Sequence, residues 1–204
     1  GDLRGAEADV GIALPLVSPP GLLVPMRLGV AGAMKIAIAR GALDRAQELL
    51  DDLAGRSRPP GTGIPGALLL VARAELRAAS GRHVEARHDF IAVGERVSWL
   101  PYANPEVLGW RTGLALSESA LGNEEEARRL AAEAVRLAHE AGGRRGIGLT
   151  LRVLGTVTPG EEGIELLREA SDVLGGTRAR LRRAEALVEL GAALRRANRR
   201  REAR

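Results

Sequence analysis

The sequence contains no cysteine, which excludes disulfides and thiolate chemistry, and we expect a chain of the reducing cytoplasm. Only four residues are aromatic (Phe90, Trp99, Tyr102 and Trp110), and Lys35 is the single lysine. The core must therefore be built from leucine, alanine, valine and isoleucine. Alanine-rich packing suits close contact between helices better than it suits a β-sandwich.

Long apolar segments are also missing. The longest uncharged stretch, Val10–Met26, contains Pro15, Pro19, Pro20 and Pro25. A membrane helix needs about 20 apolar residues, and four prolines would break it, so we expect no membrane span. Hydrophobic residues make up 45% and charged residues 27% of the chain, which argues for a folded protein and against disorder. Because the chain begins without methionine, we expect it to be a piece of a longer polypeptide.

What the sequence does contain is a repeat of about 40 residues. A glycine, or in the last case an asparagine, precedes an alanine by five residues at Gly1/Ala6, Gly41/Ala46, Gly81/Ala86, Gly122/Ala127 and Asn198/Ala203. The glycine is expected to end one helix in the left-handed conformation. The alanine should lie where a second helix crosses the first. Seven residues before the glycine or asparagine stand Ala74, Ala115 and Gly191, small residues that let paired helices approach; Met34 is the exception.

This repeat predicts an all-α fold, an α-solenoid of antiparallel helix pairs that resembles the tetratricopeptide right-handed superhelix. We expect one domain over 1–204, with repeats near 1–40, 41–80, 81–121, 122–158 and 159–197 and a partial repeat at 198–204. Complete helices are expected over Leu22–Arg40, Leu43–Ala54, Gly66–Ser80, Val84–Ser98, Pro105–Leu121, Glu124–Ala141, Arg145–Leu154, Glu161–Leu174 and Ala179–Ala197. Partial helices should start at Asp2 and Arg199.

Patterns that imitate chemical sites lack the residues that the chemistry needs. The segment Pro59–Pro65 resembles a phosphate loop, but it ends in Ile and Pro where the motif has Lys and Ser or Thr. His83 and His88 are five residues apart and so point to different faces of a helix, and His139 is isolated. We therefore predict no catalytic residues, no metal, no cofactor and no enzymatic activity.

Three of the four aromatic residues, together with Arg111, form the first candidate binding site. Trp99, Tyr102 and Trp110 lie within twelve residues. They could simply seal the longest loop between repeats. Alternatively they form a hot spot for a partner, because Trp and Tyr anchor interfaces. Both interpretations remain open at this point.

The second candidate site is the concave groove of the solenoid. If the repeats follow the tetratricopeptide register, the first helix of each pair lines it. The groove row would then include Lys35, Glu75, Thr112, Leu116, Ser119, Glu185 and Arg195. We expect it to bind a protein partner, a second copy of the chain in a homodimer, or a small-molecule effector.

The C-terminal end is strongly basic. From Arg178 to Arg204 there are ten arginines and three glutamates. These arginines could contact nucleic-acid phosphates, but pairs such as Arg182/Glu185 favour a solvated or packed helix face. The apolar side of this helix should be packed, so we expect no sequence-specific DNA binding. That apolar side consists of Leu181, Leu187, Val188, Leu190 and Leu194.

The second half of the chain resembles a known family more specifically. The residues that carry this resemblance are Asn104-Pro105, Trp110-Arg111, Leu121-Gly122, Ala127–Ala131, Gly148–Arg152, Leu166–Ala170, Ala184–Gly191 and Leu194–Arg204. They resemble the C-terminal helical region of large ATP-binding regulators of the LuxR family. The resemblance implies transcription activation, often of antibiotic and other secondary-metabolite genes in actinobacteria. It also implies a nucleotide-binding domain before the repeats and a DNA-binding helix-turn-helix after them. The alternative is a tetratricopeptide-type peptide-binding adaptor unrelated to transcription.

Overall fold

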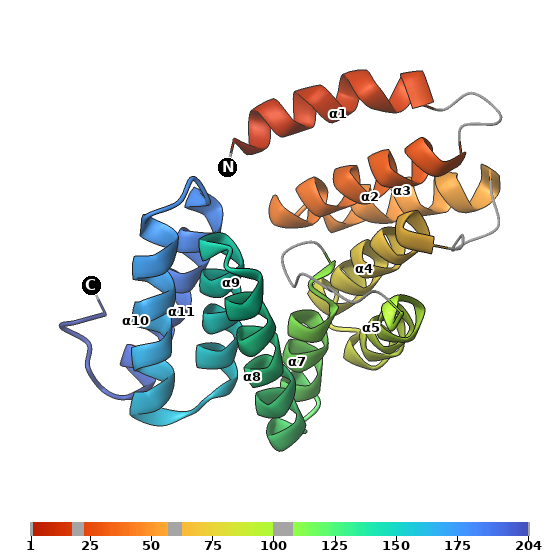
Figure 1. Cartoon of the computed structure of the whole chain (residues 1–204). Helices are drawn as coiled ribbons and strands as arrows, with labels where there is room; N and C mark the ends of the chain where they lie inside the picture. The colour runs from red at the N-terminus through yellow and green to blue at the C-terminus, as the bar shows by residue number, and fades with distance from the viewer. Residues whose placement is uncertain (1, 18–22, 57–62, 100–107, 204) are drawn as a thin grey trace. The chain divides into compact units, whose positions relative to one another are not determined.

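The computed structural model describes residues 2–17, 23–56, 63–99 and 108–203 (Figure 1). The helices are α1 (Leu3–Val17), α2 (Leu23–Ala39), α3 (Leu43–Arg56), α4 (Gly63–Ala79), α5 (His83–Val97), α7 (Trp110–Ala120), α8 (Glu124–Ala141), α9 (Arg144–Val157), α10 (Gly160–Gly175) and α11 (Arg180–Arg196). No strand occurs in these ranges. The predicted all-α fold of successive antiparallel helix pairs is confirmed, with each pair joined by a short turn.

The turn has the predicted conformation in the pairs α2/α3, α4/α5 and α7/α8 and after α11, but not between α9 and α10, where Thr158 is extended. Gly41, Gly81 and Gly122 have φ of 75°, 75° and 84°, and Asn198 has φ 61°. The next amide donates to a carbonyl five residues back in every case, at 2.8–2.9 Å, which is the Schellman motif. A residue with a side chain is strained at positive φ, and asparagine tolerates it better than most. These four positions therefore define one repeat register through the chain.

Small residues lie at the helix crossings as predicted. Ala46, Ala86 and Ala127, five residues after the turn glycine, are fully buried, and so are Ala74 and Ala115 on the first helices. Met34 is also fully buried, although it is much larger. The crossing therefore needs a buried apolar residue, and only some pairs need a small one.

The chain divides into two compact units, Asp2–Pro101 (the N-terminal unit) and Tyr102–Arg204 (the C-terminal unit). The single continuous repeat domain stays a prediction. In the N-terminal unit α4 packs mainly against α2 and α5, and only lightly against α3, while α1 packs on α2. The core joining α2, α3 and α4 includes Met34, Leu53, Leu69 and Leu76.

In the C-terminal unit the helices pack in the order of the chain, α7 on α8, α8 on α9, α9 on α10 and α10 on α11 (Figure 1). The helices α9 and α10 form a pair that lacks the glycine–alanine spacing of the other pairs, and glycines bring them together. A Cβ built on Gly155 would lie 2.9 Å from the Gly163 carbonyl oxygen, and one on Gly148 would lie 2.6 Å from Leu174 Cγ. This crossing is closer than any side chain allows.

One sequence-based expectation about α11 is wrong. Leu194 is buried and Leu181 and Leu190 are half-buried, but Leu187 and Val188 are 48% and 68% exposed. The reason is that α9 and α10 cover only part of the apolar surface of α11. In the part of the chain that the structure describes, no further helix packs on the remainder.

Candidate functional site

In the N-terminal unit the predicted groove row begins with an ion pair between two first helices. Lys35 on α2 and Glu75 on α4 lie six residues before Gly41 and Gly81, so they occupy the same repeat position. Lys35 Nζ donates to Glu75 Oε1 at 3.0 Å, and the two side chains are 37% and 35% exposed. An exposed pair of this kind adds little to stability, so its charges are available to a ligand at small cost.

The C-terminal unit has a corresponding polar row between the first helices α9 and α11. Arg152 Nη1 donates to Glu189 Oε1 at 2.5 Å, and the hydroxyl of Thr156 donates to Glu189 Oε2 at 2.5 Å. Glu185, a predicted site residue, lies 3.9 Å from Arg152 Nε and accepts from Arg182 Nη1 at 2.9 Å. The expected pairing of Arg182 with Glu185 is therefore present.

The other predicted groove residues are not drawn into one site. The hydroxyl of Thr112 donates to the Gly109 carbonyl of its own helix start at 2.7 Å. Leu116 and Ser119 are half-buried on α7, and Arg195 is exposed on α11. Within the predicted row, Lys35 and Glu75 form an ion pair, whereas Glu185 pairs with Arg152 and Arg182, which the prediction did not include.

The aromatic candidates lie in different units. Trp99, in the turn after α5, is 67% exposed, and its Nε1 donates to the Arg96 carbonyl at 2.9 Å. Trp110 starts α7 and is half-buried; the Arg111 guanidinium lies 4.2 Å from its ring centroid. Arg111 Nε also donates to Glu133 Oε1 at 3.0 Å. Tyr102 lies outside the described residues.

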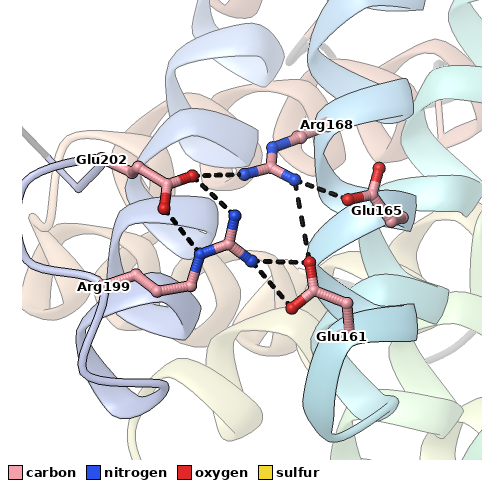
Figure 2. Close-up of polar contacts among 5 residues, drawn as sticks. All are labelled: Glu161, Glu165, Arg168, Arg199 and Glu202. Atoms are coloured by element: carbon pink, nitrogen blue, oxygen red, sulfur yellow. Dashed lines mark hydrogen bonds and ion pairs between the residues drawn. The ribbon is translucent and has the colours of Figure 1, made fainter.

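The basic C-terminal end folds back on α10 (Figure 2). Arg199 Nη1 donates to both Glu161 oxygens at 2.6 and 2.7 Å, and Arg199 Nε donates to Glu202 at 2.7 Å. Arg168 pairs with Glu202 at 2.9 Å and with Glu165 at 2.5 Å. The hydrogen bond from Arg199 holds the pKa of Glu202 below its ordinary value, and the same contacts raise the pKa of Arg199. These arginines are engaged with carboxylates.

A cavity that sequence reasoning missed lies between α1, α2 and α3. It measures about 370 Å³ and is lined by Glu7, Val10, Gly11, Leu14, Ala33, Ile36, Ala37, Arg40, Ala42, Arg45 and Leu49. Glu7 forms an ion pair with Arg40. Ala33 and Ala37 stand eight and four residues before Gly41, whereas the same positions before Gly81 hold the much larger Arg73 and Arg77. This difference in side-chain size between the two repeats is the sequence signal that could have predicted the cavity.

In that next repeat the same positions hold a buried ion cluster. Asp89 is 5% exposed and accepts hydrogen bonds from Arg73 Nε and Nη2 at 2.9 and 2.7 Å and from Arg77 Nη1 at 2.6 Å. Two arginines satisfy one carboxylate, joining α4 to α5. This arrangement is structural, because the carboxylate oxygens are used inside the helix pair.

The structure adds little about the sites that the sequence argued against. Of the phosphate-loop imitation, only Gly63–Pro65 are described, and they begin α4; 59–62 fall outside. Within the described residues, His, Asp and Glu side chains form no group that could hold a metal ion, and no helix has the length and hydropathy of a membrane span. The predictions of no metal, cofactor or enzymatic activity stay predictions.

Comparison with known proteins gives one informative result. No family model matches the chain, and no curated protein matches it. The structure is similar to the crystal structure of BtubC (BKLC) from P. vanneervenii, with a TM-score of 0.66 over 100% of this chain and 87% of that one, at 13% identity. At this identity the likeness establishes the fold alone, an all-α tetratricopeptide-like stack of helix pairs.

Proposed function

We propose that the chain is a helical-repeat module that binds a protein partner along its first helices, as tetratricopeptide-type adaptors do. The observation that carries this proposal is the position of Lys35 and Glu75. They occupy one repeat position on neighbouring first helices and leave a third of each side chain open to solvent. A partner's charged or amide groups can replace this weak ion pair with contacts of their own. Such contacts would let the two side chains recognise an extended segment of the partner.

The exposed Trp99, in the turn after the second helix α5, is our candidate for an apolar contact with the partner. A tryptophan that is two-thirds exposed at the end of α5 offers a large, stiff surface at low conformational cost. Together, charge on the first helices and an aromatic anchor fit a peptide better than they fit a reacting substrate. We also propose that the module has no catalytic activity, in line with the absence of any recognisable catalytic motif in the sequence.

A peptide array tests the proposal. We expect the peptides that bind the 204-residue chain to bind its Lys35→Ala/Glu75→Ala variant at least tenfold more weakly. The control is Arg45→Ala/Glu48→Ala, which removes a more exposed pair, 62% and 65% open to solvent, on the second helix α3 and should leave binding unchanged. If both variants weaken binding equally, or if neither does, the first helices are not the binding surface.

The more specific interpretation, a regulatory segment of a LuxR-type transcription activator, rests on the sequence likeness of residues 104–204 alone. No comparison with known proteins supports it, and the adaptor interpretation accounts for the fold equally well. Reading the gene on either side of this segment distinguishes the two. A nucleotide-binding motif upstream and a helix-turn-helix downstream would establish the regulator, which would then bind DNA through that downstream domain.

A further inference from the structure

The cavity between α1, α2 and α3 occupies a place that the other repeats fill with side chains. Its lining includes Ala33 and Ala37, eight and four residues before the turn glycine. The residues at these two positions before the other three turns are Arg73 and Arg77, Leu114 and Glu118, and Leu190 and Leu194. All six of these larger residues are buried or half-buried. The cavity is therefore open because this repeat has two alanines, and not because the repeat fold requires it.

The two second helices that border the cavity stand apart on α2. Both α1 and α3 pack against α2, but among the described residues they do not contact each other. Gly11 lines the cavity from α1, and a Cβ built on it would meet nothing within 4 Å. At about 100° per residue, Ile12 and Leu16 point to the opposite side of α1. A neighbour that covers these two exposed side chains would therefore leave the cavity open.

The charged residues of the lining lie at one end of the cavity. Glu7 is near the start of α1, Arg40 directly follows α2, and Arg45 is in the first turn of α3. Antiparallel packing brings these three segments together, and Glu7 forms an ion pair with Arg40. Leu14 is seven residues after Glu7, about 10 Å farther along the axis of α1. The other lining residues are all Ala, Gly, Val, Ile or Leu, so the cavity has one charged end and an apolar body.

The size of the cavity limits what it can hold. Its volume of about 370 Å³ is near the lower end of ligand sites, which measure about 300–1,000 Å³. A water molecule takes about 30 Å³, and a methylene group is of similar size. The cavity therefore holds about a dozen non-hydrogen atoms, which is the size of a short aliphatic chain with one head group.

The charges at the cavity end indicate which head group fits. Two guanidinium groups and one carboxylate line this end. Arg40 is paired with Glu7 and Arg45 with Glu48, in exposed contacts that add little to stability. A ligand carboxylate can therefore replace Glu7 at Arg40, where a guanidinium can donate two parallel hydrogen bonds to it. Glu7, whose side chain is 56% exposed, then returns to water.

We propose that this cavity binds a medium-chain aliphatic carboxylate, with the carboxylate at Arg40 and the chain between α1 and α3. The chain displaces loosely held water from apolar walls, which favours binding. This site goes beyond the proposed function, because it takes a small molecule and shares no residue with the Lys35–Glu75 contact.

Three probes with the same eight-carbon chain test the head group: octanoate, octylamine and octan-1-ol. Isothermal titration calorimetry measures the binding of each probe to the 204-residue chain. We expect octanoate to bind saturably, with one molecule per chain, and at least tenfold more tightly than the other two probes. Arg40→Gln should weaken octanoate binding at least tenfold and leave octan-1-ol binding unchanged. Tighter binding of octylamine than of octanoate would overturn the carboxylate head group in favour of a cation at Glu7.

A cavity-filling variant tests the location. Ala33→Leu/Ala37→Leu introduces the two leucines that α11 has at these repeat positions, so we expect the chain to stay folded by circular dichroism and to lose saturable octanoate binding. Gly11→Leu fills the same space from α1 and should act likewise if the double variant unfolds. The control is Ala39→Leu, at an exposed residue of α2 outside the cavity lining, which should leave octanoate binding unchanged.

Two results would overturn the proposal. One is the absence of saturable octanoate binding to the unchanged chain. The other is unchanged octanoate binding in a folded cavity-filling variant. Because the Lys35→Ala/Glu75→Ala variant leaves the cavity lining intact, a failure of the peptide test would not affect either measurement.

Discussion

The two units share one repeat register and pack their helices differently. In the N-terminal unit the first helix α4 rests mainly on the preceding first helix, α2. In the C-terminal unit the first helix α9 rests mainly on the preceding second helix, α8, and touches α7 lightly. Six residues, 57–62, separate α3 from α4, whereas only Gly142 and Gly143 separate α8 from α9. The short connection holds α9 against α8, so connection length decides which neighbour a first helix contacts.

The two units also fill their interiors with different chemistry. The N-terminal unit places the Arg73–Asp89–Arg77 cluster between α4 and α5. The C-terminal unit brings α9 and α10 together through Gly155 and Gly163, where no side chain fits. The repeat register therefore sets where two helices cross, while the size of the side chains at the crossing sets the distance between the helices. The following experiments test this comparison.

The largest effect is expected from Gly163→Ala in the C-terminal unit. Its Cβ would fall on the Thr158 carbonyl oxygen and 2.8 Å from the Gly155 carbonyl oxygen. Relieving this clash requires α9 and α10 to separate, and we expect a loss of about 3 kcal/mol or more in the free energy of unfolding. Urea denaturation followed by circular dichroism measures it.

The control for this variant is Gly32→Ala in α2, where a Cβ would meet nothing within 4 Å. It should stabilise the helix by about 0.5–1 kcal/mol, because alanine loses less backbone freedom than glycine. A loss of stability at Gly32, or none at Gly163, would contradict the distinction between the two units.

The next largest effect is expected from Asp89→Asn in the N-terminal unit. Neutralising this carboxylate leaves Arg73 and Arg77, each about a quarter exposed, close together without a shared anion. Losses of about 3–5 kcal/mol are usual for a fully buried pair, and partial exposure reduces our expectation to about 2–3 kcal/mol. Thermal and urea denaturation measure the change. Glu48→Gln in the exposed Arg45–Glu48 pair is the control and should cost less than about 1 kcal/mol.

A smaller loss of stability, equal in the two units, is expected from substitutions at matched repeat positions. Ala74→Leu and Ala115→Leu each insert a larger side chain at a fully buried crossing, seven residues before the turn glycine. We expect each to cost about 1–3 kcal/mol through overpacking. The denaturation midpoints of the two variants are compared with that of the unchanged chain. If only one of them falls, the repeat register holds for one unit alone.

The smallest effect concerns the contacts of Figure 2. Arg199 lowers the pKa of Glu202 from 4.5, so the contribution of this pair is complete above that value and is lost as the pH falls through the lowered pKa. In Arg199→Gln the pKa of Glu202 should rise toward 4.5, while Arg200→Gln should leave it unchanged. An NMR titration of the Glu202 carboxyl group measures this. An unchanged pKa in Arg199→Gln would show that the C-terminal turn is not held by Arg199.

The sequence predicted the helix pairs well because their boundaries are local. The left-handed glycines and Asn198 stop helices through their own backbone preferences, and the buried alanines follow at a fixed distance. The Gly155–Gly163 crossing and the cavity beside Ala33 and Ala37 were missed, because each depends on residues from different helices. The packing of Leu187 and Val188 was predicted wrongly from an amphipathic pattern. An amphipathic pattern shows which side of a helix is apolar, but it does not show whether another helix covers that side.

Packing among the described helices joins helices that are at most two elements apart along the sequence. A folding chain therefore closes only short loops before native contacts form, and helical proteins of this kind fold in microseconds to milliseconds. Each helix pair can begin folding without waiting for a distant segment, and order then spreads from neighbour to neighbour. By the same reasoning we expect local opening to start at the ends of each unit, where a helix has fewer neighbours.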